Sequence, residues 1–259
     1  MDLDQRFWGA SVEELQQGYV SLPDDGGFVC LVCGHHAENG RIYPVQDRWY
    51  EAEAYMRRHI EELHRSMFHY LLDMDKKWTG LTDVQRDVLQ AYYEGKSDAE
   101  TAKLLGSKQS TVRYHRFHLR EKEKQAKVFL SLMGLLAERS EKDSESFMTI
   151  HRTAAMVDER YAVTNEEREK ILKTYFPYGL QGPMREFPSK EKRKIVVLMH
   201  IAGRFDRNRK YTEKEVNDVL KEAHSDYVTL RRYMIDYGFL DRKDDCSVYW
   251  VKGEKQSDE

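Results

Sequence analysis

The sequence predicts a mainly α-helical protein with small β elements, built from several modules. Three observations lead to this fold class. Apolar residues recur at three- and four-residue spacing between Ala52 and Met74, as on one face of a helix. Residues 81–139 form helical patterns separated at Gly95 and Gly106, and residues 189–252 predict three helices followed by a hairpin.

Composition limits the class of protein. The chain has 259 residues with 42 Lys and Arg against 45 Asp and Glu, so its net charge of -3 does not by itself indicate nucleic acid. The charges are unevenly spread, because residues 108–127 and 190–210 are basic whereas residues 1–29 are acidic. Two basic stripes on a mildly acidic chain are typical of a nucleic-acid binder, although two solvated helix faces would give the same pattern.

Cysteine usage and hydropathy predict a cytoplasmic protein. An odd number of cysteines, three, argues against a disulfide framework and for a reducing compartment. No apolar run approaches the ~18 residues that a membrane span needs. The acidic start of the chain lacks the basic and apolar regions of a signal peptide.

Breaks in the pattern divide the chain into segments. Thr79-Gly80 ends the first helical pattern, residues 138–146 are polar, and glycines and prolines crowd residues 177–188. We therefore expect an N-terminal domain over residues 1–78, a helical domain over 79–139, a helical connector and linker over 140–188, a compact domain over 189–252 and a disordered tail over 253–259.

Residues 81–126 carry the pattern of a helix-turn-helix. Thr82 with Gln85, and Ser97 with Glu100, have the spacing of capping boxes and start two helices. A third helix starts near Lys108. On such a recognition helix, residues near the N-terminus reach base edges and flanking cations hold phosphates. The candidate DNA-binding residues are Lys108, Gln109, Ser110, Thr111, Arg113, Tyr114, Arg116 and Arg120.

This region resembles the LuxR/GerE-type helix-turn-helix family of transcription regulators. The matching residues are Leu81-Thr82, Val88-Leu89, Gly95-Lys96-Ser97, Glu100, Ala102, Leu105-Gly106 and Ser110-Thr111-Val112-Arg113. The resemblance implies binding to double-stranded DNA. Two features depart from the family: Ser107 replaces an aliphatic residue, and the third helix runs on from Leu119 to Leu136, which suggests a dimerising or linking helix. A plain three-helix bundle used for protein contact is the alternative.

Four residues near the N-terminus have the spacing of a metal site. Cys30 and Cys33, followed by Gly34, form a Cys-x-x-Cys knuckle, and the next helix supplies His59 and His64. Two thiolates and two imidazoles would close a tetrahedral structural Zn²⁺ site. Because helix positions five apart diverge by ~140°, the last turn must distort. The knuckle lies too far from the histidines for a DNA-reading finger, so we expect zinc to hold a small fold together.

Other interpretations of the cysteine pair stay open. His35 and His36 follow the knuckle directly and are rival ligands. The pair could also be two reduced cysteines beside ordinary surface histidines. A thioredoxin-like redox role is weaker, because no βαβ pattern surrounds the pair.

The order of elements in residues 189–252 predicts a winged helix. Thr212 and Glu215 form a capping box in the second helix, and Gly238 ends the third. This segment resembles a bacterial domain family of unknown function that often accompanies helix-turn-helix regulators, on residues 187–194, 211–217, 230–233, 238–240 and 249–250. It could bind DNA, a partner or effector, or a second copy. Candidate phosphate contacts are Lys190, Lys192, Arg193, Lys194, Arg231, Arg232 and Arg242.

Together these patterns predict a sequence-specific transcription regulator and not an enzyme. The sequence has no glycine-rich phosphate loop, no G-x-S-x-G and no H-E-x-x-H. We expect duplex DNA and a second copy of the chain as partners, with dimerisation through residues 120–136, and no membrane. The sequence identifies no small-molecule effector. The alternative is an RNA- or protein-binding regulatory adaptor that uses the same folds.

Overall fold

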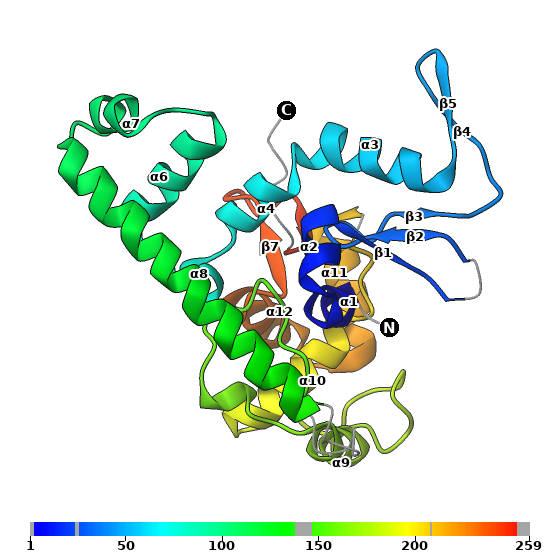
Figure 1. The fold of residues 1–259 in the computed structure, drawn as a ribbon. Coiled ribbons are helices and arrows are strands. Elements are labelled where there is room, and N and C mark those ends of the chain that lie inside the picture. Colours follow the sequence, from blue (N-terminus) through cyan, green and yellow to red (C-terminus); the bar gives the residue numbers. More distant parts are fainter. Residues whose placement is uncertain (1–2, 24–25, 138–146, 208, 253–259) are drawn as a thin grey trace. The chain divides into compact units, whose positions relative to one another are not determined.

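The computed structural model describes residues 3–23, 26–137, 147–207 and 209–252 (Figure 1). These residues are mainly helical with small antiparallel sheets, which confirms the predicted fold class at this level. The chain forms two compact units. Unit 1 comprises Met1–Ile60 with Ser144–Glu259, and unit 2 comprises Glu61–Asp143. The division falls within one helix, α3 (Ala52–His64).

The N-terminal part of unit 1 is built from short elements that precede α3. The capping box of Ser11 and Glu14 starts the second helix, and Gly18 ends it in the left-handed conformation. The first three strands form an antiparallel sheet in the order β1-β2-β3, in which Tyr19 faces Cys30, and the last two form a hairpin. The elements are α1 (Leu3–Gly9), α2 (Val12–Gln17), β1 (Tyr19–Ser21), β2 (Phe28–Cys30), β3 (His36–Ala37), β4 (Tyr43–Val45) and β5 (Arg48–Tyr50).

The C-terminal part of unit 1 combines helices with a three-stranded antiparallel sheet of order β6-β8-β7. The sequence predicts three helices and a hairpin here. The structure adds β6, whose two residues are too few to show a periodicity. The elements are η2 (Glu159–Tyr161), α9 (Asn165–Tyr175), α10 (Glu191–Ala202), β6 (Lys210–Tyr211), α11 (Glu213–Ala223), α12 (Tyr227–Asp236), β7 (Leu240–Arg242) and β8 (Tyr249–Val251).

One hydrophobic core runs through this C-terminal part. Helix α10 lies at its centre, where Ile195, Leu198 and Ile201 are fully buried. The core also includes residues of the segment that the sequence analysis interprets as a connector: Met148, Ala154, Tyr161, Val163, Leu172, Tyr175, Phe176 and Met184. Gly238 permits this packing, because a Cβ there would lie 2.3 Å from the carbonyl oxygen of Thr153.

Unit 2 continues from the end of α3 through five further helices. They are α4 (Met67–Asp73), α5 (Lys76–Thr79), α6 (Asp83–Tyr93), α7 (Asp98–Leu104) and α8 (Gln109–Ala137). Helix α8, the long green helix of Figure 1, is a single helix, as expected from the run beyond Leu119. It packs against α6 and α7 through its first turns, where Val112 is buried with Val88 and Ala102.

Within the described residues, none of the helices combines the length and the apolar character needed to cross a bilayer.

Candidate metal centre and nucleic-acid interface

Two cysteines and two histidines converge at the end of strand β2 and the end of helix α3. Cys30, Cys33, His59 and His64 each offer one ligand atom, and these atoms all lie within 4.8 Å of one another. The Sγ of Cys33 lies 3.1 Å from the Nε2 of His59. Cys30 and His59 are buried, at 0% and 6% exposure. The structure thus brings together the four residues predicted from spacing, and the cluster could hold a metal ion.

The knuckle is a tight turn between strands β2 and β3. The amide of Gly34 donates to the carbonyl of Cys30 at 2.9 Å, and the amide of Cys30 donates to the carbonyl of His35, also at 2.9 Å. Gly34 has a φ of 79°, which a glycine adopts without strain. The turn therefore folds Cys33 back toward Cys30. The hydrogen bond with Cys33, together with burial, raises the pKa of the Cys30 thiol.

The second pair of ligands comes from one helix. His59 lies within α3 and His64 is its last residue. The backbone leaves the helix directly afterwards, where Arg65 has a φ of 60° and the amide of Ser66 donates to the carbonyl of His64 at 2.6 Å. The regular helix thus ends at the second histidine. A spacing of five residues requires such a distortion, because positions five apart diverge on a regular helix.

The rival ligands His35 and His36 lie outside the cluster. The Nε2 of His36 lies 2.6 Å from the carbonyl oxygen of Gly26, within hydrogen-bond distance. The ring of His35 stacks on that of His59, with centroids 4.6 Å apart and planes inclined by 16°. His35 therefore packs against a ligand as a wall of the site.

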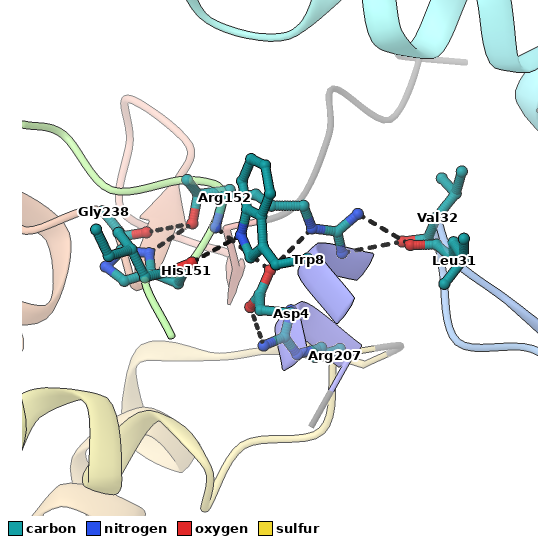
Figure 2. A network of polar contacts seen from close by, with 10 residues as sticks. Asp4, Trp8, Leu31, Val32, His151, Arg152, Arg207 and Gly238 are labelled. Atoms are coloured by element: carbon teal, nitrogen blue, oxygen red, sulfur yellow. Dashed lines mark hydrogen bonds and ion pairs between the residues drawn. The ribbon is translucent and has the colours of Figure 1, made fainter. Parts of the chain in front are cut away.

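An arginine from far along the chain holds the knuckle (Figure 2). Arg152 donates from Nη1 to the carbonyl of Leu31 at 3.0 Å and from Nη2 to the carbonyl of Val32 at 3.4 Å. Leu31 and Val32 are the two residues between the cysteines. The Nε of Arg152 donates to Asp4 at 2.8 Å, and Arg207 donates to the other oxygen of the same carboxylate at 2.9 Å.

The Asp4 carboxylate is the centre of this network and is 3% exposed. Burial alone would raise the pKa of Asp4, but the charges and hydrogen bonds of Arg152 and Arg207 outweigh it and lower the pKa. The guanidinium of Arg152 also lies 4.7 Å from the centroid of the Phe7 ring. Sequence reasoning missed this network, because Asp4 and Arg152 are 148 residues apart and no local pattern joins them.

Seven of the eight candidate DNA-binding residues of unit 2 lie on the first half of α8, and Lys108 directly precedes the helix. Both predicted capping boxes are present, Thr82 with Gln85 and Ser97 with Glu100. Gly95 and Gly106 make the two turns in the left-handed conformation, with φ of 77° and 59°. All eight predicted contact residues are exposed: Lys108, Gln109, Ser110, Thr111, Arg113, Tyr114, Arg116 and Arg120.

One carboxylate ties these cations to the preceding helix. Asp98, the first residue of α7, accepts from Arg116 at 2.9 Å and from Arg113 at 3.4 Å, and also from the hydroxyl of Tyr92 at 2.7 Å. The hydrogen bond from Tyr92, with those from the two arginines, lowers the pKa of Asp98. The side chain of Arg113 is nevertheless 64% exposed, so most of it is open to a ligand.

The predicted cations of the C-terminal part differ among themselves. Lys194 is 12% exposed and pairs with Glu191 at 2.8 Å, and Arg231 is 16% exposed and pairs with Glu213 at 2.6 Å. These two side chains are used within the fold and offer little surface to a phosphate. The other five are exposed: Lys190, Lys192, Arg193, Arg232 and Arg242.

Comparison with known proteins gives one match. Residues 183–251 match the model of a family described as "Uncharacterized protein conserved in bacteria (DUF2087)". This region covers α10 to β8, the segment whose sequence resembles a bacterial domain family of unknown function. No curated protein and no solved structure matches the chain.

Proposed function

We propose that the chain is a sequence-specific DNA-binding regulator that reads duplex DNA with the first turns of α8. One observation carries the proposal: eight polar and basic side chains are exposed at the start of a helix whose inner face packs on α6 and α7. Such an arrangement would suit a helix-turn-helix, in which the recognition helix enters the major groove.

The chemistry of these side chains fits the two kinds of contact that DNA offers. An arginine such as Arg113 can bond the O6 and N7 of guanine with two hydrogen bonds, and Ser110 and Thr111 can bond bases or phosphates. Lys108 and Arg120 flank these residues and suit phosphates. The N-terminus of α8 adds the positive end of a helix dipole.

The C-terminal part is proposed as a winged helix that supports this binding. Its order, α10, β6, α11, α12, β7 and β8, and its sheet of order β6-β8-β7 favour that assignment. The exposed cations Lys190, Lys192 and Arg193 at the start of α10, with Arg232 and Arg242, would contact phosphates.

The metal held by the four-residue cluster is proposed to be Zn²⁺. Two thiolates and two imidazoles form a donor set typical of structural zinc, and four protein ligands leave no open position for a substrate. Zinc bonds of about 2.3 Å to sulfur and about 2.0 Å to nitrogen need ligand atoms roughly 3.3–3.8 Å apart in a tetrahedron. The ligand atoms, all within 4.8 Å of one another, can reach this by small side-chain movements.

Selection of binding sites from random and genomic duplexes tests the DNA proposal. The full chain is expected to enrich a defined sequence, and its affinity should fall steeply with salt because phosphate contacts release counterions. Selection that enriches no duplex sequence would overturn the proposal. Retention of RNA under the same conditions would favour the adaptor function instead.

Metal analysis tests the zinc proposal. The purified chain is expected to carry about one zinc ion, and Cys33→Ser should lose it. Cys246→Ser is the matched control, because Cys246 lies outside the cluster, and it should retain the ion. A metal-free wild type whose Cys30 and Cys33 thiols both react freely would contradict the proposal.

A further inference from the structure

The second half of α8 presents a large apolar surface. Nine of the twelve residues from Ala126 to Ala137 are apolar, and every residue from Lys122 to Ala137 is exposed. Soluble monomers rarely expose apolar patches larger than a few hundred Å². Seven large side chains here are at least 47% exposed: Val128, Phe129, Leu130, Leu132, Met133, Leu135 and Leu136.

The apolar side chains surround most of this helix. The three remaining residues, Lys127, Ser131 and Gly134, recur at four- and three-residue spacing and lie on one stripe. At 100° per residue, the apolar positions cover roughly 220° of the circumference. That arc is wider than the seam of a two-stranded coiled coil, and a helix so widely apolar is stable in water when more than one surface packs against it.

No undescribed segment of this chain has the composition to cover the arc. Residues 138–146, which follow α8, are Glu, Arg, Ser, Lys and Asp throughout. Residues 253–259 contain no large apolar side chain either, and among the other undescribed positions Met1 is the one apolar residue. Within unit 2, the described residues leave the arc exposed. A second molecule can supply the apolar cover that the undescribed segments lack.

We propose that a second copy of this chain packs on the arc. Lys127 is the one charged residue between Ala126 and Ala137, and it lies on the stripe opposite the arc. Along residues 126–137, two copies can thus meet without burying a charge, which would be costly. Seven large side chains, each about half exposed, offer roughly 700 Å², close to the ~800 Å² per partner of a standard stable interface.

The interface extends toward the first half of α8. Unit 2 has an open groove whose apolar lining includes Leu81, Leu89, Leu119 and Ala126. The charged side chains of Arg116, Arg120, Lys122 and Glu123 also line it. Leu119, Ala126 and Met133 are spaced by seven residues and lie on one face of α8. The apolar arc therefore continues along this face of α8 to the apolar wall of the groove.

A symmetric pair would join two recognition segments and would read two half-sites. This consequence rests on the proposed DNA-binding function. The dimer itself does not, because the apolar arc over residues 126–137 contains none of the eight contact residues.

Sedimentation of the full metal-loaded chain over a concentration series tests the dimer. The wild type is expected to dimerise, and Phe129→Glu should weaken dimerisation by at least about 100-fold, since each interface would bury a charge. Ser131→Glu adds the same charge to the same helix on the polar stripe, so it should dimerise like the wild type. Far-UV circular dichroism checks that both variants keep their helices.

Three results would overturn the dimer. The first is a wild type that stays monomeric throughout the series, and the second is equal dimerisation of the two variants. The third is a monomer whose residues 126–137 are protected from hydrogen exchange, because the chain would then cover its own helix. Site selection with Phe129→Glu separates this proposal from the DNA proposal. A monomer that still enriches a half-site supports both, whereas an intact dimer that enriches no sequence contradicts DNA binding alone.

Discussion

The two units use arginine and lysine differently. On the first turns of α8 in unit 2, the cations lie at the surface, and Arg113 and Arg116 remain 64% and 48% exposed beside Asp98. In unit 1, five of the seven predicted phosphate contacts are exposed too, but Lys194 and Arg231, together with Arg152, are at most 16% exposed and each pairs with a carboxylate. Both units contain a basic stripe in the sequence, so composition alone predicts the same role for both.

The location of the carboxylates makes the difference. Lys194 meets Glu191 one helical turn earlier, Arg231 meets Glu213 on α11, and Arg152 meets Asp4 from the start of the chain. A cation held in this way keeps its hydrophobic stem in the fold and its charge on an internal partner. Arg113 and Arg116 also meet a carboxylate, Asp98, but they stay 64% and 48% exposed. The exposure that a cation keeps beside its partner, and not the presence of a carboxylate, therefore separates the two groups.

The largest expected effect comes from removing the carboxylate at the centre of the unit 1 network. Asp4→Asn leaves Arg152 buried without its anion, and breaking a buried pair in this way costs about 3–5 kcal/mol. We expect the free energy of unfolding of unit 1 to fall by this amount. Urea denaturation, combined with hydrogen exchange of the helices of unit 1, measures it. Glu13→Gln, at an exposed position of α2, should change stability by less than about 0.5 kcal/mol. If Asp4→Asn unfolds with the same free energy as the wild type, the network has no structural role.

The contribution of the Asp4 carboxylate to the free energy of unfolding should disappear in acid. The arginines lower the pKa of Asp4 below its ordinary value of 3.8 in spite of burial. A carboxyl group with a lowered folded pKa contributes stability that is fully present above its unfolded pKa and is lost as the pH falls through the folded value. The difference in unfolding free energy between wild type and Asp4→Asn should be constant near neutral pH and shrink below about pH 3.8. A difference that grows on acidification would refute this assignment.

The next effect concerns the arginine that holds the knuckle. Arg152→Met removes the donors to the carbonyls of Leu31 and Val32, between the two cysteine ligands. Loss of such outer partners typically weakens metal binding by about 10–100-fold. Competition with a chromophoric chelator would measure the zinc affinity of the folded variant. Arg160→Met, which removes a cation paired with Asp158, should leave that affinity unchanged. If both variants bind zinc like the wild type, Arg152 does not position the knuckle.

Local patterns in the sequence carried much of this structure. The capping boxes at Thr82 and Ser97, and the spacing of Cys30 to Cys33 and of His59 to His64, involve residues at most five positions apart within each pair. Such patterns are visible because short-range geometry decides them. The whole metal cluster follows from two of them, joined by one sheet and one helix.

Long-range pairings were not predictable in the same way. Asp4 meets Arg152 across 148 residues, and β6 pairs with β8 across about forty residues. The segment from Met148 to Met184 joins the core even though glycines and prolines near its end suggest a linker. These contacts depend on tertiary packing, which periodicity and charge do not encode. The same limit hid Glu213, the partner of Arg231.

A reciprocal pair of variants sharpens the comparison of the two units. Arg113→Ala should lower specific DNA affinity by about 1–3 kcal/mol and leave the unfolding free energy within about 0.5 kcal/mol of the wild type. Arg231→Ala should instead lower stability by about 1 kcal/mol, because it removes bonds to Glu213 and Asn217, and should leave DNA affinity unchanged. Titration of a selected duplex and urea unfolding measure the two quantities. A loss of DNA affinity in Arg231→Ala alone would reverse the assignment.

The smallest effect lies in the salt dependence of binding. Lys108 is exposed just before the N-terminus of α8, whereas Lys194 is held by Glu191 and lies 5.0 Å from the centroid of the Tyr233 ring. Each phosphate contact contributes about 0.9 to the slope of log affinity against log salt. Lys108→Ala should therefore reduce that slope by about 1, and Lys194→Ala should leave it unchanged. Binding to one selected duplex at four or more salt concentrations gives both slopes. Equal reductions would show that a cation paired within unit 1 still reaches the DNA, and the contrast between the units would then not govern binding.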